Sequence, residues 1–477
     1  MKKTAYFKVL MISIGLLGPL SCATASSLLE VYQQALQSDP LIHEADARRM
    51  ATLEAVPQAR GLLLPQLSAS GGYSTGSRTS YGPFTTEAGF LFAESSADAE
   101  TSNWGAELRQ TLFRWDQWVG LKQAGKRVAK AEVDFEAAQQ DLIVRVATRY
   151  FEVLAAEDRL TAIHADRLAI ARQLEQAQQR FDVGLIAITD VQESQAAYDQ
   201  SVASEIQAKR ELATARELLR EITGEYIPVL AAPGDNFPLV SPNPEDENSW
   251  IDLAMDQNLS LVASRFDEEI ARDEISYRRT GHYPTLDLVA NYNESDTDIS
   301  NQRLTLPGDQ FEFPGFTTTE ETDRIAIQLN IPLFSGGRTS SRVREAVHLH
   351  RASREQLQRV TRETERQTRD AYLGVLSEIS RVNALGQAVE SSRTALEATQ
   401  AGFEVGTRTI VDVLNSQRSL YSAIANHYRA RYTYIGNVLR LKQAAGTLQI
   451  QDLEDIDRYL SDRRPPEEVI REEEAAN

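Results

Sequence analysis

The sequence predicts two copies of one structural unit, in which a pair of amphipathic β-strands lies between α-helices. The predicted fold class is therefore an all-α barrel joined to a transmembrane β-barrel. Three observations lead to this prediction. The second half of the chain repeats the first, four segments alternate apolar and polar residues as strands do, and two segments of nearly 70 residues carry an apolar helical stripe.

The first 25 residues have the parts of a secretory signal. Three lysines precede the apolar run 9–20, which is too short to span a bilayer, and Ala23-Thr24-Ala25 offers a small-residue cleavage site. Residues 1–25 are therefore predicted to be removed as a signal peptide, which would place the mature chain outside the cytoplasm. An alternative is that Cys22, the only cysteine, becomes a lipid-anchored N-terminus.

Charge and hydropathy exclude further classes. Without the three signal lysines the chain has 47 basic and 69 acidic residues, a formal charge of −22, and an acidic protein repels nucleic acid at low salt. No stretch after the signal is apolar for 18 residues, so no transmembrane helix is predicted. A secreted chain of this size is then either soluble or inserted into a membrane as a barrel.

An internal repeat divides the mature chain. A shift of 219 residues aligns Pro65 with Pro284, and a shift of 222 aligns the Phe-Asp-Val-Gly run 181–184 with the Phe-Glu-Val-Gly run 403–406. Because the shift drifts by only three residues, one unit has been duplicated. The predicted boundaries are 26–226 for the first unit, 227–249 for a proline-rich connector, 250–450 for the second unit and 451–477 for a C-terminal segment with an acidic tail.

Each unit begins with a predicted helix, 28–61 or 250–281, that ends shortly before a proline where a strand starts. In the second unit, apolar residues alternate with mostly polar ones from Leu286 to Tyr292 and again over 325–333, and the first unit shows the same pattern more weakly. The segments between paired strands are rich in Ser, Thr, Gly and Asp. They are predicted to be long extracellular loops: residues 74–102 and 295–322.

Two long helices follow the strands. Residues 116–183 carry apolar side chains at spacings of three and four, and 338–404 has one at every seventh position from Val375 to Phe403. Globular helices average only about 12 residues, so these are predicted to be coiled-coil helices. The two shorter helices of each unit together match its long helix in length, which gives four helical columns per chain. These shorter helices include 187–223 and 410–445.

Four strands cannot close a membrane barrel, because both edge strands would leave unpaired backbone groups in lipid. Two chains supply eight strands, whose side chains would fill the interior, and three supply twelve, which leaves a lumen. We therefore predict a trimer with a 12-stranded β-barrel and a 12-column α-helical tunnel. Apolar strand residues should face lipid. Aromatic residues at the strand-to-helix junctions should form the periplasmic girdle: Phe113, Trp115, Trp118 and Phe334.

Five sequence runs carry a family resemblance over nearly the whole mature chain. They are Leu63–Leu67, Gln179–Leu185, Ala187–Gln192, Gly281–Leu288 and Val405–Leu414. These runs resemble the TolC family of outer-membrane efflux proteins. The resemblance implies a trimer in the outer membrane, a helical tunnel in the periplasm, and an equatorial belt built from the connector and the C-terminal segment.

The function that the resemblance implies is an exit duct of tripartite efflux pumps and type I secretion. Its partners would be two further copies of the chain (a homotrimer), a periplasmic adaptor protein, an inner-membrane pump of the resonance-nodulation-division or ABC type, and outer-membrane lipid. Two alternatives remain open. One is a factor dedicated to drug or cation efflux, and the other is a soluble periplasmic coiled-coil scaffold, which would leave the amphipathic strands unexplained.

Two glycines are expected to end the long helices, since glycine readily adopts the left-handed conformation found at helix C-termini. The resemblance adds a role, because these turns are similar to the hairpin tips that dock a periplasmic adaptor. Small exposed tips would allow close backbone approach. The expected docking residues are Val183, Gly184, Leu185, Val405, Gly406 and Thr407.

The helices after the tips begin with a threonine and an aspartate, Thr189 and Asp190 in the first unit and Thr409 and Asp412 in the second. Thr189 has a glutamine three residues later, the spacing of a capping box, and a carboxylate is stabilised in a first helical turn. The resemblance implies a second role for these residues in a closed periplasmic aperture. Asp412 would lie at its narrowest point, and Arg408 would reach Thr189 and Asp190 of a neighbouring hairpin.

Two positions depart from the family pattern. Asn415 stands where the family has an aspartate, and Phe403 stands where it has a tyrosine. Without a hydroxyl, Phe403 cannot bond to Asp190, so the closed state should be held mainly by Arg408. The expected gate residues are Asp412, Asn415, Arg408, Asp190, Thr189 and Phe403.

No catalytic, cofactor or metal site is predicted. The six histidines are scattered, and His348 and His350 are two residues apart on a predicted helix, so they do not share a face. The run Ser335-Gly336-Gly337 lacks the lysine and the spacing of a phosphate-binding loop. The energy for transport would therefore come from partner proteins.

Overall fold

Residues 25–86, 89–234 and 237–461 are described by the computed structural model of the chain. Nearly all of the predicted signal peptide, with Cys22, and the acidic tail after Ser461 lie outside these ranges. No helix within them is both long enough and apolar enough to cross a membrane.

The described chain forms two compact units, and each draws on both sequence repeats. The helical unit contains the residues up to Ile42, Gln139–Ala254 and the chain from Gln367 onwards. The sheet unit contains His43–Ala138 and Met255–Arg366. The two longest helices run through parts of both and have the predicted lengths of 68 and 67 residues: α4 (Trp115–Asp182) and α8 (Arg338–Glu404).

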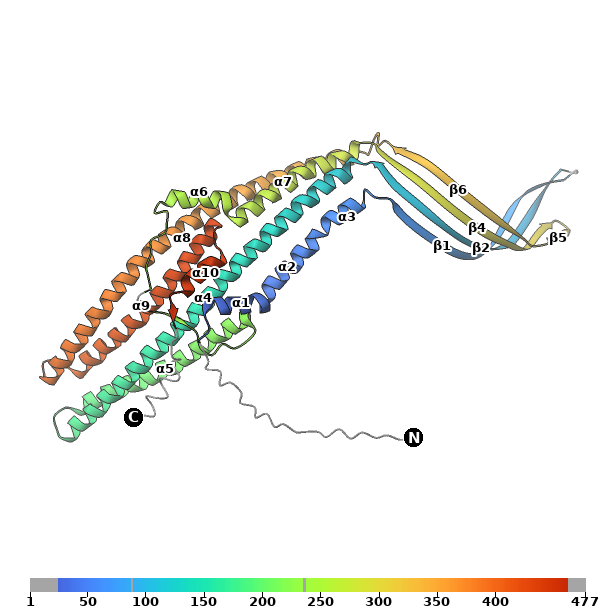
Figure 1. Cartoon of the computed structure of the whole chain (residues 1–477). Helices are drawn as coiled ribbons and strands as arrows, with labels where there is room; N and C mark the ends of the chain where they lie inside the picture. The colour runs from blue at the N-terminus through green and yellow to red at the C-terminus, as the bar shows by residue number, and fades with distance from the viewer. Residues whose placement is uncertain (1–24, 87–88, 235–236, 462–477) are drawn as a thin grey trace, which may run out of the picture. The chain divides into compact units, whose positions relative to one another are not determined.

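A four-stranded antiparallel sheet dominates the sheet unit (Figure 1). All four predicted strands are present in it. A fifth, short strand pairs with the far end of β4. In spatial order the long strands are β1 (Gln66–Thr86), β2 (Gly89–Phe113), β4 (Thr285–Leu306) and β6 (Phe316–Asn330), and the short one is β5 (Asp309–Phe313).

The predicted loops at 74–102 and 295–322 are wrong, because the strands continue through most of both segments. Nearly every backbone group there pairs with the facing strand, which satisfies its hydrogen bonds without any apolar pattern. Polar side chains also pair across the strands, and the hydroxyl of Thr319 donates to Asp296 at 2.6 Å. Serine and threonine therefore mark polar strands here and not loops.

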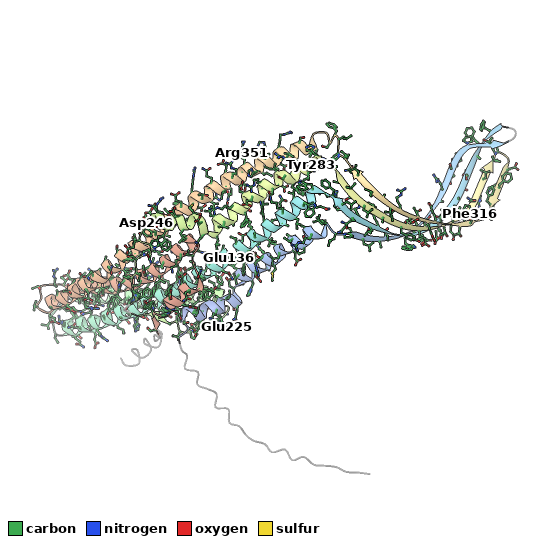
Figure 2. The ribbon with its side chains drawn as sticks, turned by 45° about the horizontal axis from the view of Figure 1, so that its top comes forward. Glu136, Glu225, Asp246, Tyr283, Phe316 and Arg351 are labelled. Atoms are coloured by element: carbon green, nitrogen blue, oxygen red, sulfur yellow. The ribbon has the colours of Figure 1, made fainter. Side chains whose placement is uncertain are left out.

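One face of the sheet is apolar along the half of the strands that joins the helices. Figure 2 marks this half by Tyr283, just before the start of β4, and marks the far part of the sheet by Phe316, at the start of β6. A row of directly paired apolar residues crosses all four strands, and its outermost members are 76% and 80% exposed: Leu67, Leu108, Ala290 and Ile325. The adjacent row, on the other face, is polar: Ser68, Glu107, Asn291 and Arg324. The sheet is therefore amphipathic, with its apolar face uncovered.

Within the sheet unit, ion pairs join α4 to α7 (Leu259–Arg279), which is followed by the short helix η1 (Thr280–His282). The Asp273 carboxylate contacts Lys126 at 2.7 Å and Lys122 at 3.2 Å. Burial raises the pKa of Asp273, but the bonds from the two lysines outweigh it and hold that pKa below its usual value. These cations and carboxylates compensate one another between the helices.

The two predicted N-terminal helices, 28–61 and 250–281, are wrong as single helices, because each is interrupted. Asp39 is extended, as expected for a residue before proline, and Asn258 caps a new helix by accepting the Leu261 N–H at 3.0 Å. The first becomes α1 (Leu28–Ser38), α2 (Pro40–Leu53) and α3 (Ala55–Gly61), and the second becomes α6 (Glu247–Gln257) and α7.

The helical unit packs the connector and the C-terminal segment onto α4. The buried Tyr150 hydroxyl donates to the carbonyl of Ala231 at 2.6 Å and to that of Ser26 at 3.2 Å. The short strand after Ala231 pairs with the one at Leu460. The other elements of this unit are α5 (Ile188–Thr223), β3 (Ala232–Pro233), α9 (Ile410–Ala445), α10 (Ile450–Asp457) and β7 (Leu460–Ser461).

Candidate gate and docking tips

The two longest helices, α4 and α8, each end in a turn of the same type. Gly184 and Gly406 take φ of 77° and 76°, in the left-handed region. The Gly184 N–H donates to the Phe181 carbonyl at 2.8 Å and the Leu185 N–H to the Arg180 carbonyl at 2.8 Å, and the same two bonds recur around Gly406. This is the Schellman arrangement that satisfies the last carbonyls of a helix. The glycines end the helices as the sequence predicts.

Both tips expose aliphatic side chains. Val183, Leu185 and Val405 are 70%, 73% and 76% exposed, and Thr407 is also exposed. Apart from each glycine and its two neighbours in the chain, no atom lies within 4 Å of where a Cβ on Gly184 or Gly406 would sit. Only the backbone conformation therefore restricts those two positions. Apolar side chains held on a rigid turn in solvent are suited to contact with another protein.

A capping box starts α9. The Thr409 N–H donates to Oδ2 of Asp412 at 3.0 Å, and the Asp412 N–H donates to Oγ1 of Thr409 at 3.3 Å. The backbone N–H of Thr409, its hydroxyl and the charge of Arg408 hold the pKa of the Asp412 carboxyl below its usual value. Asp412 therefore stays ionised near neutral pH, and one of its oxygens is engaged by its own helix.

The capping box predicted at Thr189 is wrong. Helix α5 begins at Ile188, and its N-cap is Ala187, whose side chain has no oxygen to accept a hydrogen bond. Ala187 occupies the position that Thr409 holds in the second repeat, so Thr189 and Asp190 lie inside the first turn of α5. The exchange of threonine for alanine explains why only one of the two repeats has a side-chain cap.

Phe403 is partly buried between the two hairpins of the chain. Its ring packs against a cluster of Ile170, Ile410 and Leu414, and the guanidinium carbon of Arg180 lies 5.0 Å from the ring centroid. A contact between α4 and α8 thus stands where the family pattern has a tyrosine hydroxyl. Sequence analysis missed Arg180, because its ring partner lies in the other repeat.

The Arg408 side chain is exposed, and its aliphatic stem passes close to Gly402. A Cβ on Gly402 would come within 2.7 Å of Cγ of Arg408, so the bare glycine leaves room for the arginine stem. In the part of the chain that the structure describes, no hydrogen bond or ion pair joins Arg408 to Thr189 or Asp190. Asn415 is also exposed. The link from Arg408 to Thr189 and Asp190 of a neighbouring hairpin, which the family resemblance implies, remains a prediction.

A metal site is not formed in the described ranges, where no group of three His, Cys, Asp or Glu residues is placed to hold an ion. Five of the gate residues lie in the last turn of α8 or the first two turns of α5 and α9, and Arg408 lies in the turn that joins α8 to α9. The six docking residues lie in the two turns. The arrangement offers charged and apolar surfaces for contact.

Comparison with known proteins gives a consistent result. The family model described as outer membrane efflux protein matches residues 31–225 and 250–447. The chain is 39% identical to outer membrane protein TolC of Vibrio cholerae over 93% of this chain and 96% of that protein, and 37% identical to TolC of Escherichia coli over 95% and 88%. It is 30% identical to the alkaline protease secretion protein AprF of Pseudomonas aeruginosa over 91% and 87%. The fold is similar to the CmeC outer membrane channel of Campylobacter jejuni, with a TM-score of 0.68, 15% identity and coverage of 96% and 98%.

The asymmetry of the two caps can be measured by amide hydrogen exchange. Removing the Thr409 cap with Thr409→Ala should cost about 1 kcal/mol locally, so the first turn of α9 should exchange roughly fivefold faster than in Thr409→Ser. Thr189→Ala, the matched change in the other repeat, should leave exchange at the start of α5 unaltered. Equal acceleration at both helices would contradict the assignment of Ala187 as the N-cap.

Proposed function

Because the chain belongs to the outer membrane efflux protein family, we propose that three copies assemble into one exit duct, with a 12-stranded β-barrel in the outer membrane and a 12-column α-helical tunnel in the periplasm. The chain itself is a TolC-like outer-membrane efflux or secretion channel and not an enzyme. The observation that carries the trimer is the amphipathic sheet with two open edges.

Both edges of the sheet are unpaired within the described ranges. Strand β1 pairs only with β2, and β6 pairs only with β4. Backbone groups left unpaired in lipid cost several kcal/mol each, so the edges must pair with other copies of the chain. Three copies supply twelve strands, enough for a lumen, whereas eight strands would be filled by their own side chains.

The apolar face of the sheet extends about as far as the apolar band of an outer-membrane barrel. The rings of Trp104 and Tyr292 lie with their centroids 5.1 Å apart in a tilted arrangement, and both side chains donate hydrogen bonds to Glu294, as expected at a membrane–water interface. Phe113, at the other limit, lies nine residues along β2 from Trp104. At about 3.3 Å per residue and a tilt of about 40°, that distance is roughly 23 Å, close to the roughly 25 Å of an outer-membrane apolar band.

The residues at the lower limit of this band support the predicted girdle. Trp115 and Trp118 begin α4 and are 48% and 55% exposed, and Phe334 is 88% exposed. The strands continue well past Trp104 to Gly89, so the polar half of the sheet would project beyond the membrane. A soluble scaffold would have no use for this uncovered apolar face.

The cargo and partners follow from the family and the tips. We propose that an inner-membrane pump, of the resonance-nodulation-division or ABC type, and a periplasmic adaptor deliver drugs or proteins to the duct. The adaptor would dock on the two tips through Val183, Gly184, Leu185, Val405, Gly406 and Thr407. The relative named for protease secretion supports a role in type I secretion. The connector and C-terminal segment, joined by the pairing of β3 with β7, would form the equatorial belt.

The periplasmic end would be closed by the gate residues. Three Asp412 carboxylates would line its narrowest point, and Arg408 would bond to Thr189 and Asp190 of the next chain. Asn415 adds no charge, and Phe403 holds Arg180 within its own chain. We therefore expect Arg408 to be the main contact between neighbouring chains at the gate.

Mass measurement of the detergent-extracted protein should give three protomers. Ile327→Arg, on the apolar face, should sharply reduce insertion, because arginine facing lipid costs roughly 2–4 kcal/mol per chain. The adjacent Gln328→Arg, on the opposite face, should insert normally. A stable monomer or dimer, or equal insertion of the two variants, would argue against the barrel.

Docking is tested at Gly406. Gly406→Trp should abolish export while the trimer still assembles and inserts, because a bulky side chain would block close approach of the adaptor. Gly406→Ala shares the strain of the left-handed backbone but adds little bulk, so it should retain most export. Normal export in an assembled Gly406→Trp trimer would remove the tips from the mechanism.

The gate is tested by single-channel recording in planar bilayers. Arg408→Ser should raise conductance by loosening the contacts between chains. Asn415→Asp should strengthen block by multivalent cations, since it doubles the carboxylates in a narrow and poorly screened pore, and the uncharged Asn415→Ser should not. Unchanged conductance in an intact Arg408→Ser trimer would return Asp412 to the capping role alone.

A further inference from the structure

A cavity of about 840 Å³ lies in the helical unit, between α4, α5 and α9. These helices run side by side in Figure 1. The α9 side of the cavity is one helical stripe from Arg418 to Arg429, with members at spacings of three and four residues. The lining also includes small or aliphatic side chains, among them Ala155, Ala162 and Ile170. The cavity is therefore a groove with an apolar floor, and we call it the arginine groove after the arginines that line it.

Five arginines line the groove against three acidic residues, in a chain that is strongly acidic as a whole. Two of the arginines have their own carboxylates. Arg149 contacts Glu152 at 2.8 Å, and Arg159 contacts Glu211 at 2.6 Å. Glu152 lies on α4 with Arg149, whereas Glu211 lies on α5 and pairs with Arg159 across the two helices.

The other three arginines, Arg210, Arg418 and Arg429, have no carboxylate within ion-pair distance among residues 25–86, 89–234 and 237–461. The third acid of the groove, Asp166, accepts a hydrogen bond from Gln417 at 3.1 Å and feels Arg418 only as a nearby charge. The groove thus has three guanidinium groups available to a ligand. A guanidinium binds carboxylates through two parallel hydrogen bonds.

Cross-helix contacts place these three groups along the groove. The Arg159–Glu211 pair aligns α5 with α4, and the Gln417–Asp166 bond aligns α9 with α4. With about 1.5 Å of rise per residue, the three free arginines lie at successive levels roughly 8 Å apart. The groove therefore matches an elongated ligand better than a compact ion.

The connector does not cover the groove. Arg429 lines it, and Arg431, two positions further and therefore roughly 200° around α9, donates to the carbonyl of Gly234 in the connector. The connector and the groove lie on opposite faces of α9. In the proposed duct, the connector must lie on the outer surface of the tunnel, because otherwise it would obstruct the lumen. The groove, on the opposite face of α9, would then face the lumen.

We propose that the arginine groove is a cargo-binding site for elongated organic anions with an apolar body and two or more acidic groups. The inference rests on the proposed duct, because it names a class of cargo that contacts the tunnel wall. The apolar floor holds the body of the ligand and the spaced arginines hold its acidic groups. Three spaced arginines in a concave wall distinguish this site from an ordinary solvated helix face.

The test uses the assembled full-length protein in detergent and isothermal titration calorimetry with pamoate, in which a methylene joins two hydroxynaphthoate rings that each carry one carboxylate. The control ligand is methylenedi-2-naphthol, which has the same body without carboxylates. The groove variant is Arg210→Gln, Arg418→Gln and Arg429→Gln combined. The matched variant removes three arginines of the same unit that do not line the groove: Arg381→Gln, Arg393→Gln and Arg440→Gln.

Pamoate should bind the unmodified protein more tightly than the control ligand, and raising the salt concentration should weaken it. The groove variant should lose at least tenfold in affinity and the matched variant less than twofold. Equal loss in the two variants, or none in the groove variant, would overturn the proposal. If the triple variant does not assemble, Arg429→Gln alone should cost roughly threefold, and unchanged binding would overturn it equally. The assembled mass is measured on the same samples, so failure of the trimer is distinguishable from failure of the site.

Discussion

Unpaired backbone groups at the edges of one sheet impose the strongest constraint on this molecule. A chain that contributes four long antiparallel strands, with β1 and β6 paired on one side only within the described ranges, cannot place that sheet in lipid by itself. The apolar face of the sheet has the same consequence, since Leu67 and Ile325 are exposed in the single chain. In the proposed duct, insertion of the sheet into the membrane therefore requires assembly with further copies of the chain. It also explains why duplication of one unit suffices, because each repeat supplies one pair of strands and further copies of the chain supply the rest.

The helical unit meets a different requirement, which is to end long helices in solvent without losing rigidity. Local hydrogen bonds achieve this at both tips. Glycines in the left-handed conformation satisfy the last carbonyls of α4 and α8, and the Thr409–Asp412 box satisfies the first N–H groups of α9. Capping and gating are compatible roles for Asp412, because the bonds that engage one of its oxygens also hold the carboxyl ionised. The same contacts that start the helix thus keep a charge at the proposed aperture.

Charge is arranged differently in the two units. Between α4 and α7 of the sheet unit, Lys126 and Lys122 meet Asp273, so the charges are compensated within the chain. In the arginine groove, two arginines are paired with carboxylates, and three have no carboxylate partner in the part of the chain that the structure describes. Uncompensated cations in an acidic protein add nothing to stability by pairing, which is why a ligand is the better account of them. The contact of Phe403 with Arg180 joins the two hairpins of one chain, and in the proposed gate Arg408 would make the contacts between chains.

The sequence by itself determined the features that depend on neighbours along the chain. Heptad spacing predicted a long helix at α8, alternation predicted the four strands, and Gly184 and Gly406 predicted the ends of α4 and α8. Polar strand segments were mistaken for loops, because their partners are other strands and not an apolar core. Both helix interruptions had a local signal, which is the proline after Asp39 and the capping side chain of Asn258. The long periodic pattern around them obscured these signals. Only the tertiary structure decided the contact of Arg180 with Phe403 and the alignment of Arg210 with Arg418 and Arg429. Arg180 and Phe403, and likewise Arg210 and the two arginines of α9, are more than 200 positions apart in the sequence, and helix packing, which no local pattern encodes, brings them together.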